Sequence, residues 1–176
     1  MPVTDAEDLT TVFLFEQNLL SETWSSDQDL LRARTRQLNM VTKSRTATLI
    51  EVTGALDHGR LVINLGGHIV RLPQNRAVAL LSMIVQRRRT KNGYTHHSLF
   101  ESDKGRAHTT ISRLRDDLDE QLKPGAADCL FEEVGRSMYR LIVLKEGIVV
   151  QPEIRELVPY FLPADLVDAL LSDTAG

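Results

Sequence analysis

The sequence contains a single cysteine, Cys129, among its 176 residues. One thiol cannot form an intrachain disulfide, and it cannot supply the several sulfur ligands of a cysteine-rich zinc site. We interpret Cys129 as a small core residue, because cysteine is among the most buried residue types. No apolar run approaches the roughly 20 residues needed to cross a bilayer, and the acidic N-terminus lacks the basic-then-apolar layout of a signal peptide. We therefore expect a cytoplasmic protein without a membrane partner.

Patterns typical of enzymes and metal sites are also scarce. His97 and Glu101 lie four residues apart, but no third ligand follows at a spacing that suits zinc. Ser98 beside His97 lacks the positioned base and oxyanion site that a nucleophile needs. The Gly66–Gly67 pair is not followed by the Lys-Ser/Thr of a phosphate-binding loop. We therefore predict no catalytic residue, no metal and no cofactor, and we expect the protein not to be an enzyme.

Charge is distributed unevenly along the chain. The net charge is only −3, yet residues 59–115 contain eleven Arg/Lys against two Asp/Glu, a balance of +9. Residues 1–58 carry five Arg/Lys and nine Asp/Glu, and residues 116–176 carry five and thirteen, so both ends are acidic. A basic middle in an otherwise acidic protein indicates a surface that binds a polyanion. The alternative is a solvated basic face that pairs with the acidic ends.

Residues typical of β-strands gather in short runs on either side of a helical region. The runs that predict a small antiparallel sheet are 46–52, 60–66 and 68–72. The Gly66–Gly67 pair predicts a tight hairpin between the second and third of them. Two later runs, 129–134 and 138–144, flank Gly135 and predict a second hairpin. With helices between the two groups of strands, the fold class is α+β.

Three helices are predicted between the sheet and the second hairpin. Pro73 suits the first turn of a helix that contains the apolar run 77–85. Thr95 is able to cap a short second helix, in which we expect Leu99 and Phe100 to be turned inward. The third and longest helix is predicted over 104–122.

The predicted helix 104–122 has two different faces. Its apolar residues follow one another at spacings of three or four and form a single stripe: Ile111, Leu114, Leu118 and Leu122. The opposite face of its first half is cationic and polar, with Arg106, His108, Thr109, Ser112 and Arg113. Such a helix is suited to lie in the major groove of DNA. The alternative is an ordinary amphipathic surface helix.

The two ends of the chain have less definite patterns. Residues 5–20 have nearly helical spacing of apolar residues, although a strand competes there, and a second helix over 27–41 has a thin apolar face. A partner subunit is one way to cover that face. After residue 145 we expect a turn, a short strand at 148–150 and a helix that begins at Pro163. The predicted domains are therefore an N-terminal helical extension over 1–45, a central domain over 46–144 and a C-terminal extension over 145–176.

The order of sheet, helix, short helix, long helix and hairpin is that of a winged helix-turn-helix preceded by a small antiparallel sheet. The residues that carry a family resemblance are the segment VRLP (70–73), the pair Leu80-Leu81, Leu99, the segment ISRLRDDL (111–118) and the segment VGRSMYRL (134–141). On these residues, 59–143 resembles the C-terminal DNA-binding domain of the OmpR-type bacterial transcription factors. In that family the third helix enters the major groove, and the hairpin wing reaches the neighbouring minor groove.

The resemblance implies a set of DNA-contacting residues. On the third helix, the residues expected to face bases or nearby phosphates are Arg106, His108, Thr109, Thr110, Ser112 and Arg113, with Arg115 on the DNA-backbone side. Arg136 would lie at the tip of the wing. Residues expected to attract phosphates regardless of sequence are Arg87, Arg88, Arg89 and Lys91.

The sequence also departs from the family pattern. Ser137 and Met138 precede Tyr139, so the second glycine of the usual wing is missing. Nothing upstream resembles a phosphoacceptor receiver domain, so we expect an input other than aspartate phosphorylation.

These patterns predict sequence-specific binding to double-stranded DNA by a transcriptional regulator. We expect a homodimer, because one short helix reads few base pairs and paired half-sites multiply specificity. The alternative is a winged-helix module for protein contact that docks onto a larger assembly, such as RNA polymerase or a phage or plasmid complex.

Overall fold

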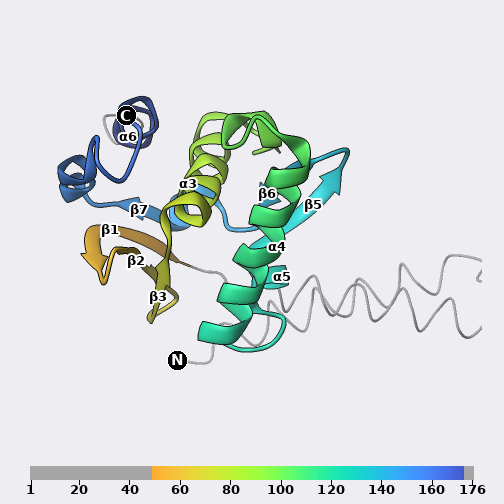
Figure 1. Ribbon diagram of the computed structural model, residues 1–176, viewed down its shortest axis with the longest axis horizontal. Helices are drawn as coiled ribbons and strands as arrows, with labels where there is room; N and C mark the ends of the chain where they lie inside the picture. Colours follow the sequence, from red (N-terminus) through yellow and green to blue (C-terminus); the bar gives the residue numbers. More distant parts are fainter. Residues whose placement is uncertain (1–48, 173–176) are drawn as a thin grey trace, which may run out of the picture. The chain divides into compact units, whose positions relative to one another are not determined.

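The computed structural model of the protein describes residues 49–172. Strands and helices are mixed along this part of the chain, as Figure 1 shows, and the predicted α+β class is confirmed. The helices predicted within 1–45 and the start of the first predicted strand lie outside the described residues. No helix within 49–172 combines the length and the apolarity that a membrane crossing requires.

The first sheet contains three consecutive antiparallel strands and one strand from much later in the chain. The strands are β1 (Ile50–Asp57), β2 (Arg60–Leu65), β3 (His68–Leu72) and β7 (Ile148–Val150). Their order is β3-β2-β1-β7, and β7 runs parallel to β1. Alternate residues such as Val52, Leu61 and Ile63 are fully buried, which is the period that a sheet with one covered face requires. The three antiparallel strands confirm the sequence pattern.

The helix α3 (Gln74–Arg89) is the centre of the described fold. It begins at Gln74, so Pro73 is its N-cap residue and not part of the first turn as predicted, and its residues Leu80, Leu81 and Ile84 are fully buried. It packs against two further helices, α4 (Lys104–Gln121) and α6 (Ala164–Ser172). In Figure 1, α3 lies between them, with α4 on one side and α6 on the other. A helix buried on so many sides is apolar for most of its length, which is the pattern of residues 77–85.

A second sheet has the strand order β4-β6-β5 and is antiparallel throughout. Its strands are β4 (Thr95–His96), β5 (Phe131–Gly135) and β6 (Met138–Leu141), and the short helix α5 (Ala126–Leu130) leads into β5. The β5–β6 hairpin confirms the second predicted hairpin, while β4 is an additional strand. Phe131, Tyr139 and Leu141 are buried and join this sheet to the same core as the first.

The short second helix differs from its prediction. Residues Thr95 and His96 pair with β6 as β4, so the helical turn begins later and is a single 3-10 turn, η1 (His97–Leu99). The side chain of His96, and not that of Thr95, accepts a hydrogen bond from the first turn, while Thr95 is fully buried. The prediction for Leu99 was wrong, because its side chain is 52% exposed. Phe100 is half-buried and lies 6.1 Å, centroid to centroid, from the ring of Tyr139.

The described part of the C-terminal segment belongs to the same compact unit as the sheets and helices that precede it. After β7 the chain forms a further 3-10 segment, η3 (Pro152–Leu157), which packs against β1, and then α6, which packs against α3. Ile154, Leu162 and Leu170 are fully buried in the common core. The segment predicted as an extension from residue 145 therefore continues the core of the central fold.

Candidate nucleic-acid interface

The rotation of α4 about its own axis is fixed by a stripe of buried residues. The buried side chains are Ala107, Thr110, Ile111, Leu114 and Leu118, which recur at spacings of one, three and four. The helix begins at a capped end, where the side chain of Asp103 accepts a 2.8 Å hydrogen bond from the backbone N–H of Arg106. The face opposite the stripe is therefore held outward.

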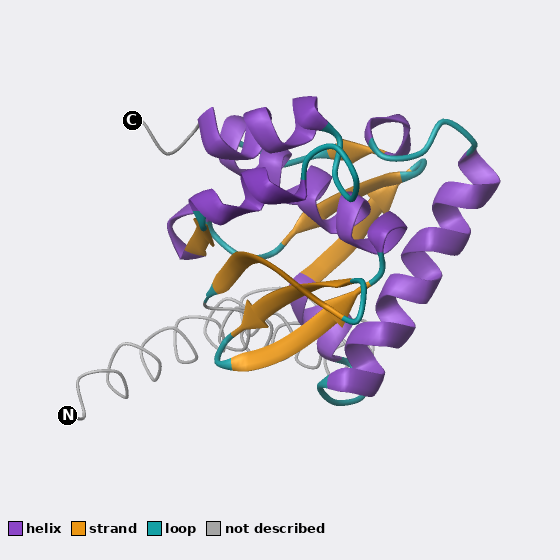
Figure 2. Cartoon of the chain, turned by 60° about the vertical axis from the view of Figure 1, so that its left-hand side comes forward, coloured by secondary structure: helices purple, strands orange, loops and turns teal. Residues whose placement is uncertain are grey.

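The outward face of α4 carries the predicted cationic and polar residues. The exposed residues of its first half include Lys104, Arg106, His108, Thr109, Ser112 and Arg113. Figure 2 shows α4 as the long helix along one side of the described fold, with its outer side directed away from the other elements. Arg106 and Arg113 are seven residues apart, which is about two helical turns or roughly 10 Å along the axis. Among the described residues, neither guanidinium has a hydrogen-bonding or ionic partner.

Two adjacent threonines on α4 have different roles. The hydroxyl of Thr109 donates a 3.0 Å hydrogen bond to the backbone oxygen of Gly105, so its methyl group and lone pairs remain available at the surface. Thr110 is only 8% exposed and lies on the buried stripe beside Ile111. The prediction that Thr110 faces a ligand was therefore wrong, because one residue further along a helix is turned by about 100°.

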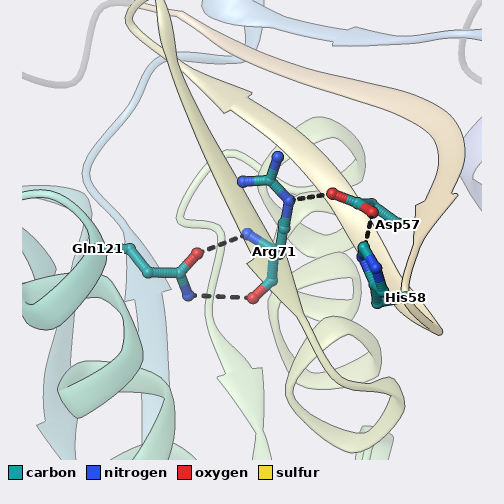
Figure 3. A network of polar contacts seen from close by, with 4 residues as sticks. All are labelled: Asp57, His58, Arg71 and Gln121. Carbon is teal, nitrogen blue, oxygen red and sulfur yellow. Dashed lines mark hydrogen bonds and ion pairs between the residues drawn. The ribbon is translucent and has the colours of Figure 1, made fainter.

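Two hydrogen bonds hold the C-terminal end of α4 against the edge strand β3. The side-chain amide of Gln121 accepts a 2.8 Å hydrogen bond from the backbone N–H of Arg71 and donates one of 3.0 Å to its backbone oxygen (Figure 3). The side chain of Arg71 pairs with Asp57, and Asp57 also bonds His58 at 2.6 Å. These contacts hold the pKa of Asp57 below its ordinary value, first through the Arg71 bond and then through that of His58. Gln121 also satisfies backbone groups of an edge strand, which would otherwise be open to pairing.

Two ion pairs hold the flanks of α4. Asp117 pairs with Arg76 of α3, and both side chains are largely buried. Arg115 pairs with Asp128 of α5, and its guanidinium lies 4.8 Å from the ring centroid of Phe131. Arg115 was predicted on the DNA-backbone side, but the structure uses its side chain to position α4 against α5 and β5. A guanidinium stacked on an aromatic ring and paired with a carboxylate is less available for an external ligand.

The tip of the β5–β6 hairpin presents Arg136. Arg136 and Ser137 both have positive φ, 46° and 63°, as in the two-residue hairpin turns that match strand twist. Gly135 precedes them with φ 98°. The side chain of Arg136 is exposed and has no partner among the described residues. The backbone oxygen of Ser137 accepts a 3.1 Å hydrogen bond from the backbone N–H of His97 in η1.

That hydrogen bond connects the hairpin tip to the start of α4. The turn η1 packs against α4 and precedes it by only a few residues. Arg136 and the cationic first half of α4 are therefore located at the same end of the described fold. Two acids in the second half of α4 are used internally: Asp117 pairs with Arg76, and Asp119 accepts a 2.9 Å hydrogen bond from the backbone N–H of Ala127.

The arginines at the end of α3 do not belong to the α4 surface. Arg87 Nε donates a 2.8 Å hydrogen bond to the backbone oxygen of Val143, and Arg88 Nη1 donates one of 2.6 Å to that of Leu170. Arg89 Nη2 donates a 3.1 Å hydrogen bond to Ser172 Oγ. Both Leu170 and Ser172 are in α6, which packs on α3 from the side opposite α4 in Figure 1. Lys91 follows in an exposed loop.

Two residues of this region were not among the predicted ones. Lys104, in the first turn of α4, is exposed beside the predicted cations, and its position inside the predicted helix was a sufficient signal. Gln121 had no such signal, because its partner Arg71 is 50 residues away in the sequence.

A metal centre is not evident among the described residues. Within residues 49–172, no three His, Cys, Asp or Glu side chains are grouped so that they could hold a metal ion. Comparison of the chain with models of protein families, with curated proteins and with solved structures gives no match. The function is therefore inferred from the geometry of the described residues.

Proposed function

We propose that this protein binds double-stranded DNA sequence-specifically as a winged helix-turn-helix and regulates transcription. In this proposal α4 lies in the major groove, and the β5–β6 hairpin is the wing that reaches the adjacent minor groove. The order α3, η1, α4, β5–β6 after an antiparallel sheet supports the winged-helix interpretation. A homodimer with two copies of α4 about 34–36 Å apart would read paired half-sites.

The observation that carries the proposal is that α4 and the tip of the β5–β6 hairpin present arginines without an internal carboxylate partner. Arg71, Arg76, Arg115 and Arg140 are each paired with a carboxylate. Arg106, Arg113 and Arg136 are exposed and have no partner within residues 49–172. An arginine without an internal carboxylate keeps its full set of donors for phosphate or base edges. All three are on the two elements that the proposal places against DNA, whereas two further exposed arginines without a partner within residues 49–172, Arg60 in β2 and Arg155 in η3, lie singly on other elements.

The side chains of Arg113 and Arg136 suit the DNA contacts that the proposal gives them. Arg113 is able to make a bidentate contact to the O6 and N7 atoms of guanine, which is worth about 1–3 kcal/mol of discrimination. Arg136, on a narrow turn, suits a narrow minor groove, where the negative potential is enhanced. The exposed carboxylates of Asp116 and Glu120 repel phosphates, so we expect the contact to be limited to the first half of α4.

The short η1 changes how the recognition helix is supported. In a helix-turn-helix the helix before the recognition helix crosses the DNA backbone. Here that element is one 3-10 turn, so we expect few contacts from it. The support for α4 comes instead from Arg71 in β3, Arg76 in α3 and Asp128 in α5.

The proposal is tested with full-length protein and DNA selected from a random pool. Binding is followed by fluorescence anisotropy on the selected sequence and on a shuffled one, over a range of salt concentrations. Arg113→Gln should weaken binding to the selected sequence by about tenfold or more, and binding to the shuffled sequence much less. Arg155→Gln in η3 is the matched control, because it removes one exposed arginine from an element that the proposal does not place on DNA.

The control should leave both affinities unchanged. If Arg113→Gln and Arg155→Gln behave alike, the proposed role of α4 is wrong. If the wild type shows no salt-dependent retention on any DNA, the alternative of a winged-helix module for protein contact is favoured.

A further inference from the structure

A basic hollow lies at the C-terminal end of α3, away from the α4 surface. Its volume is about 390 Å³, and the residues that line it include Arg87, Arg88, Lys91, Leu144, Lys145 and Glu146. Two parts of the chain far apart in sequence form it: the end of α3 with the loop that follows, and the segment after β6. The second of these is at the end of β6 opposite the hairpin tip, several residues beyond Leu141. At about 3.3 Å per extended residue, this is roughly 20 Å from Ser137.

The walls of the hollow are fixed by hydrogen bonds. Arg87 Nε is held by the backbone oxygen of Val143 at 2.8 Å. The hydroxyl of Thr90 donates to the backbone oxygen of Gln86 at 2.8 Å and accepts from the backbone N–H of Gly93 at 2.9 Å. Gly93 lies so close to the Arg87 side chain that a Cβ there would be 2.8 Å from Arg87 Cδ. The guanidinium of Arg87 is thus confined between the loop and the segment after β6.

The positive charge in the hollow is largely uncompensated. Arg87 and Arg88 donate to backbone carbonyls, which are neutral, so neither charge is cancelled by these bonds. Lys91 and Lys145 are exposed at the rim, and Glu146 is the sole carboxylate among the described residues that line the hollow. These residues amount to four positive charges and one negative charge, and Arg89, which also lines the hollow and donates to Ser172, adds a fifth positive charge. Half-buried cations that are bonded only to neutral groups favour an anion as their partner.

We propose that this hollow is a binding site for a small ligand that bears one or two phosphate groups. A phosphate monoester carries about −1.5 to −2 charges near pH 7, so one or two such groups match the charge of the site. The volume lies within the range of about 300–1,000 Å³ that is usual for small-molecule sites. Arginine guanidinium groups held in place beforehand bind phosphate oxygens in fixed, often bidentate geometry.

The contacts of α6 suggest how such a ligand would act on the protein. Arg88 donates to the backbone oxygen of Leu170, near the end of α6. A phosphate bound in the hollow would accept hydrogen bonds from the same guanidinium that donates to Leu170. It would therefore weaken or reorient the contact between α3 and α6. In this proposal the ligand is an effector that acts through the contact between Arg88 and α6, which goes beyond the proposed DNA-binding function.

The probe for this site is inorganic pyrophosphate, titrated into the full-length protein by calorimetry at constant ionic strength. The expected result is saturable binding to one site, which chloride and sulfate at the same ionic strength do not reproduce. The double substitution Lys91→Gln with Lys145→Gln removes two exposed charges without touching the bonds of Arg87 and Arg88. It should weaken pyrophosphate binding by about tenfold or more, as for the loss of charge-assisted hydrogen bonds. Arg155→Gln should leave it unchanged.

The results that overturn this proposal differ from those that overturn the DNA-binding proposal. Absence of saturable pyrophosphate binding, or an unchanged affinity in the double variant, removes the effector site. If the double variant weakens DNA binding as much as Arg113→Gln does while pyrophosphate does not bind, the hollow is part of the DNA-binding surface instead. If Arg113→Gln impairs DNA binding and keeps the wild-type affinity for pyrophosphate, the two sites are separate, as proposed.

Discussion

Replacement of Gly54 by alanine tests whether the C-terminal segment is part of the fold. Gly54 is buried in β1 and has φ +72°, a conformation that L-residues rarely adopt. A Cβ at this position would lie 2.6 Å from the backbone carbon of Glu153 and 2.9 Å from the Cα of Ile154. Both atoms are in the backbone of η3, so no change of rotamer relieves the overlap. The segment η3 has to move away from β1, or β1 has to deform.

The same chain offers a matched control in Gly59. Its φ is +71°, nearly the same as that of Gly54, and a Cβ there meets nothing within 4 Å. Gly59→Ala therefore has only the conformational cost, which is about 1–2 kcal/mol for an L-residue in the left-handed region. Gly54→Ala has the same cost and an overpacking cost of about 1–3 kcal/mol in addition. We expect a total loss of roughly 3–4 kcal/mol for Gly54→Ala.

The measurement is urea unfolding of the full-length chain, followed by circular dichroism. A difference between the two variants of about 2 kcal/mol in the free energy of unfolding would support the packing of η3 on β1. If the two variants lose the same stability, the close approach of η3 to Gly54 does not exist in solution. The description of residues 152–157 as part of the core would then be wrong.

Two further predictions concern the β5–β6 hairpin. Ser137→Gly should stabilise the protein by about 1 kcal/mol, because it relieves a left-handed φ of 63° in an L-residue; a lower urea midpoint in the variant would contradict this. Burial, and secondarily the carboxylate of Glu133, raises the pKa of Tyr139 above its ordinary value of 10.0, against an opposing effect of Arg115. The unfolded chain therefore releases this proton first, and stability should fall as the pH rises above about 10. Tyr139→Phe should make the urea midpoint less dependent on pH between about 9 and 11, and an unchanged dependence would show that Tyr139 is not its cause.

Much of the order of elements could be predicted from the sequence because it depends on local patterns. Short runs rich in β-branched residues marked β2 and β3, and the Gly66–Gly67 pair marked the turn between them. A stripe at helical spacing marked α4, and the same stripe correctly indicated which cations face outward. These features need only the covalent periodicity of strands and helices, so a single sequence contains them.

Other features depended on contacts that a local pattern does not contain. The predicted length of the short second helix was wrong. Thr95 and His96 pair with β6, so these two residues are not available to the helix, which is reduced to the single turn η1. The assignment of Thr110 was wrong because the family resemblance was extended to a residue that the apolar stripe itself turns inward. The roles of Arg87 and Arg88 were not predictable, because their acceptors, Val143 and Leu170, are 56 and 82 residues away.

The sequence by itself determined which residue types are available and on which face of a helix or strand they lie. It could not determine which arginines are free, because a guanidinium is the same group whether or not a carboxylate is beside it. Only the tertiary structure brought Asp117 to Arg76 and Asp128 to Arg115, and left Arg106 and Arg113 without such partners among the described residues. The physical reason is that ion pairing depends on the distance between two charges in space. The spacing of apolar residues in a sequence shows only which face of a single helix or strand is buried.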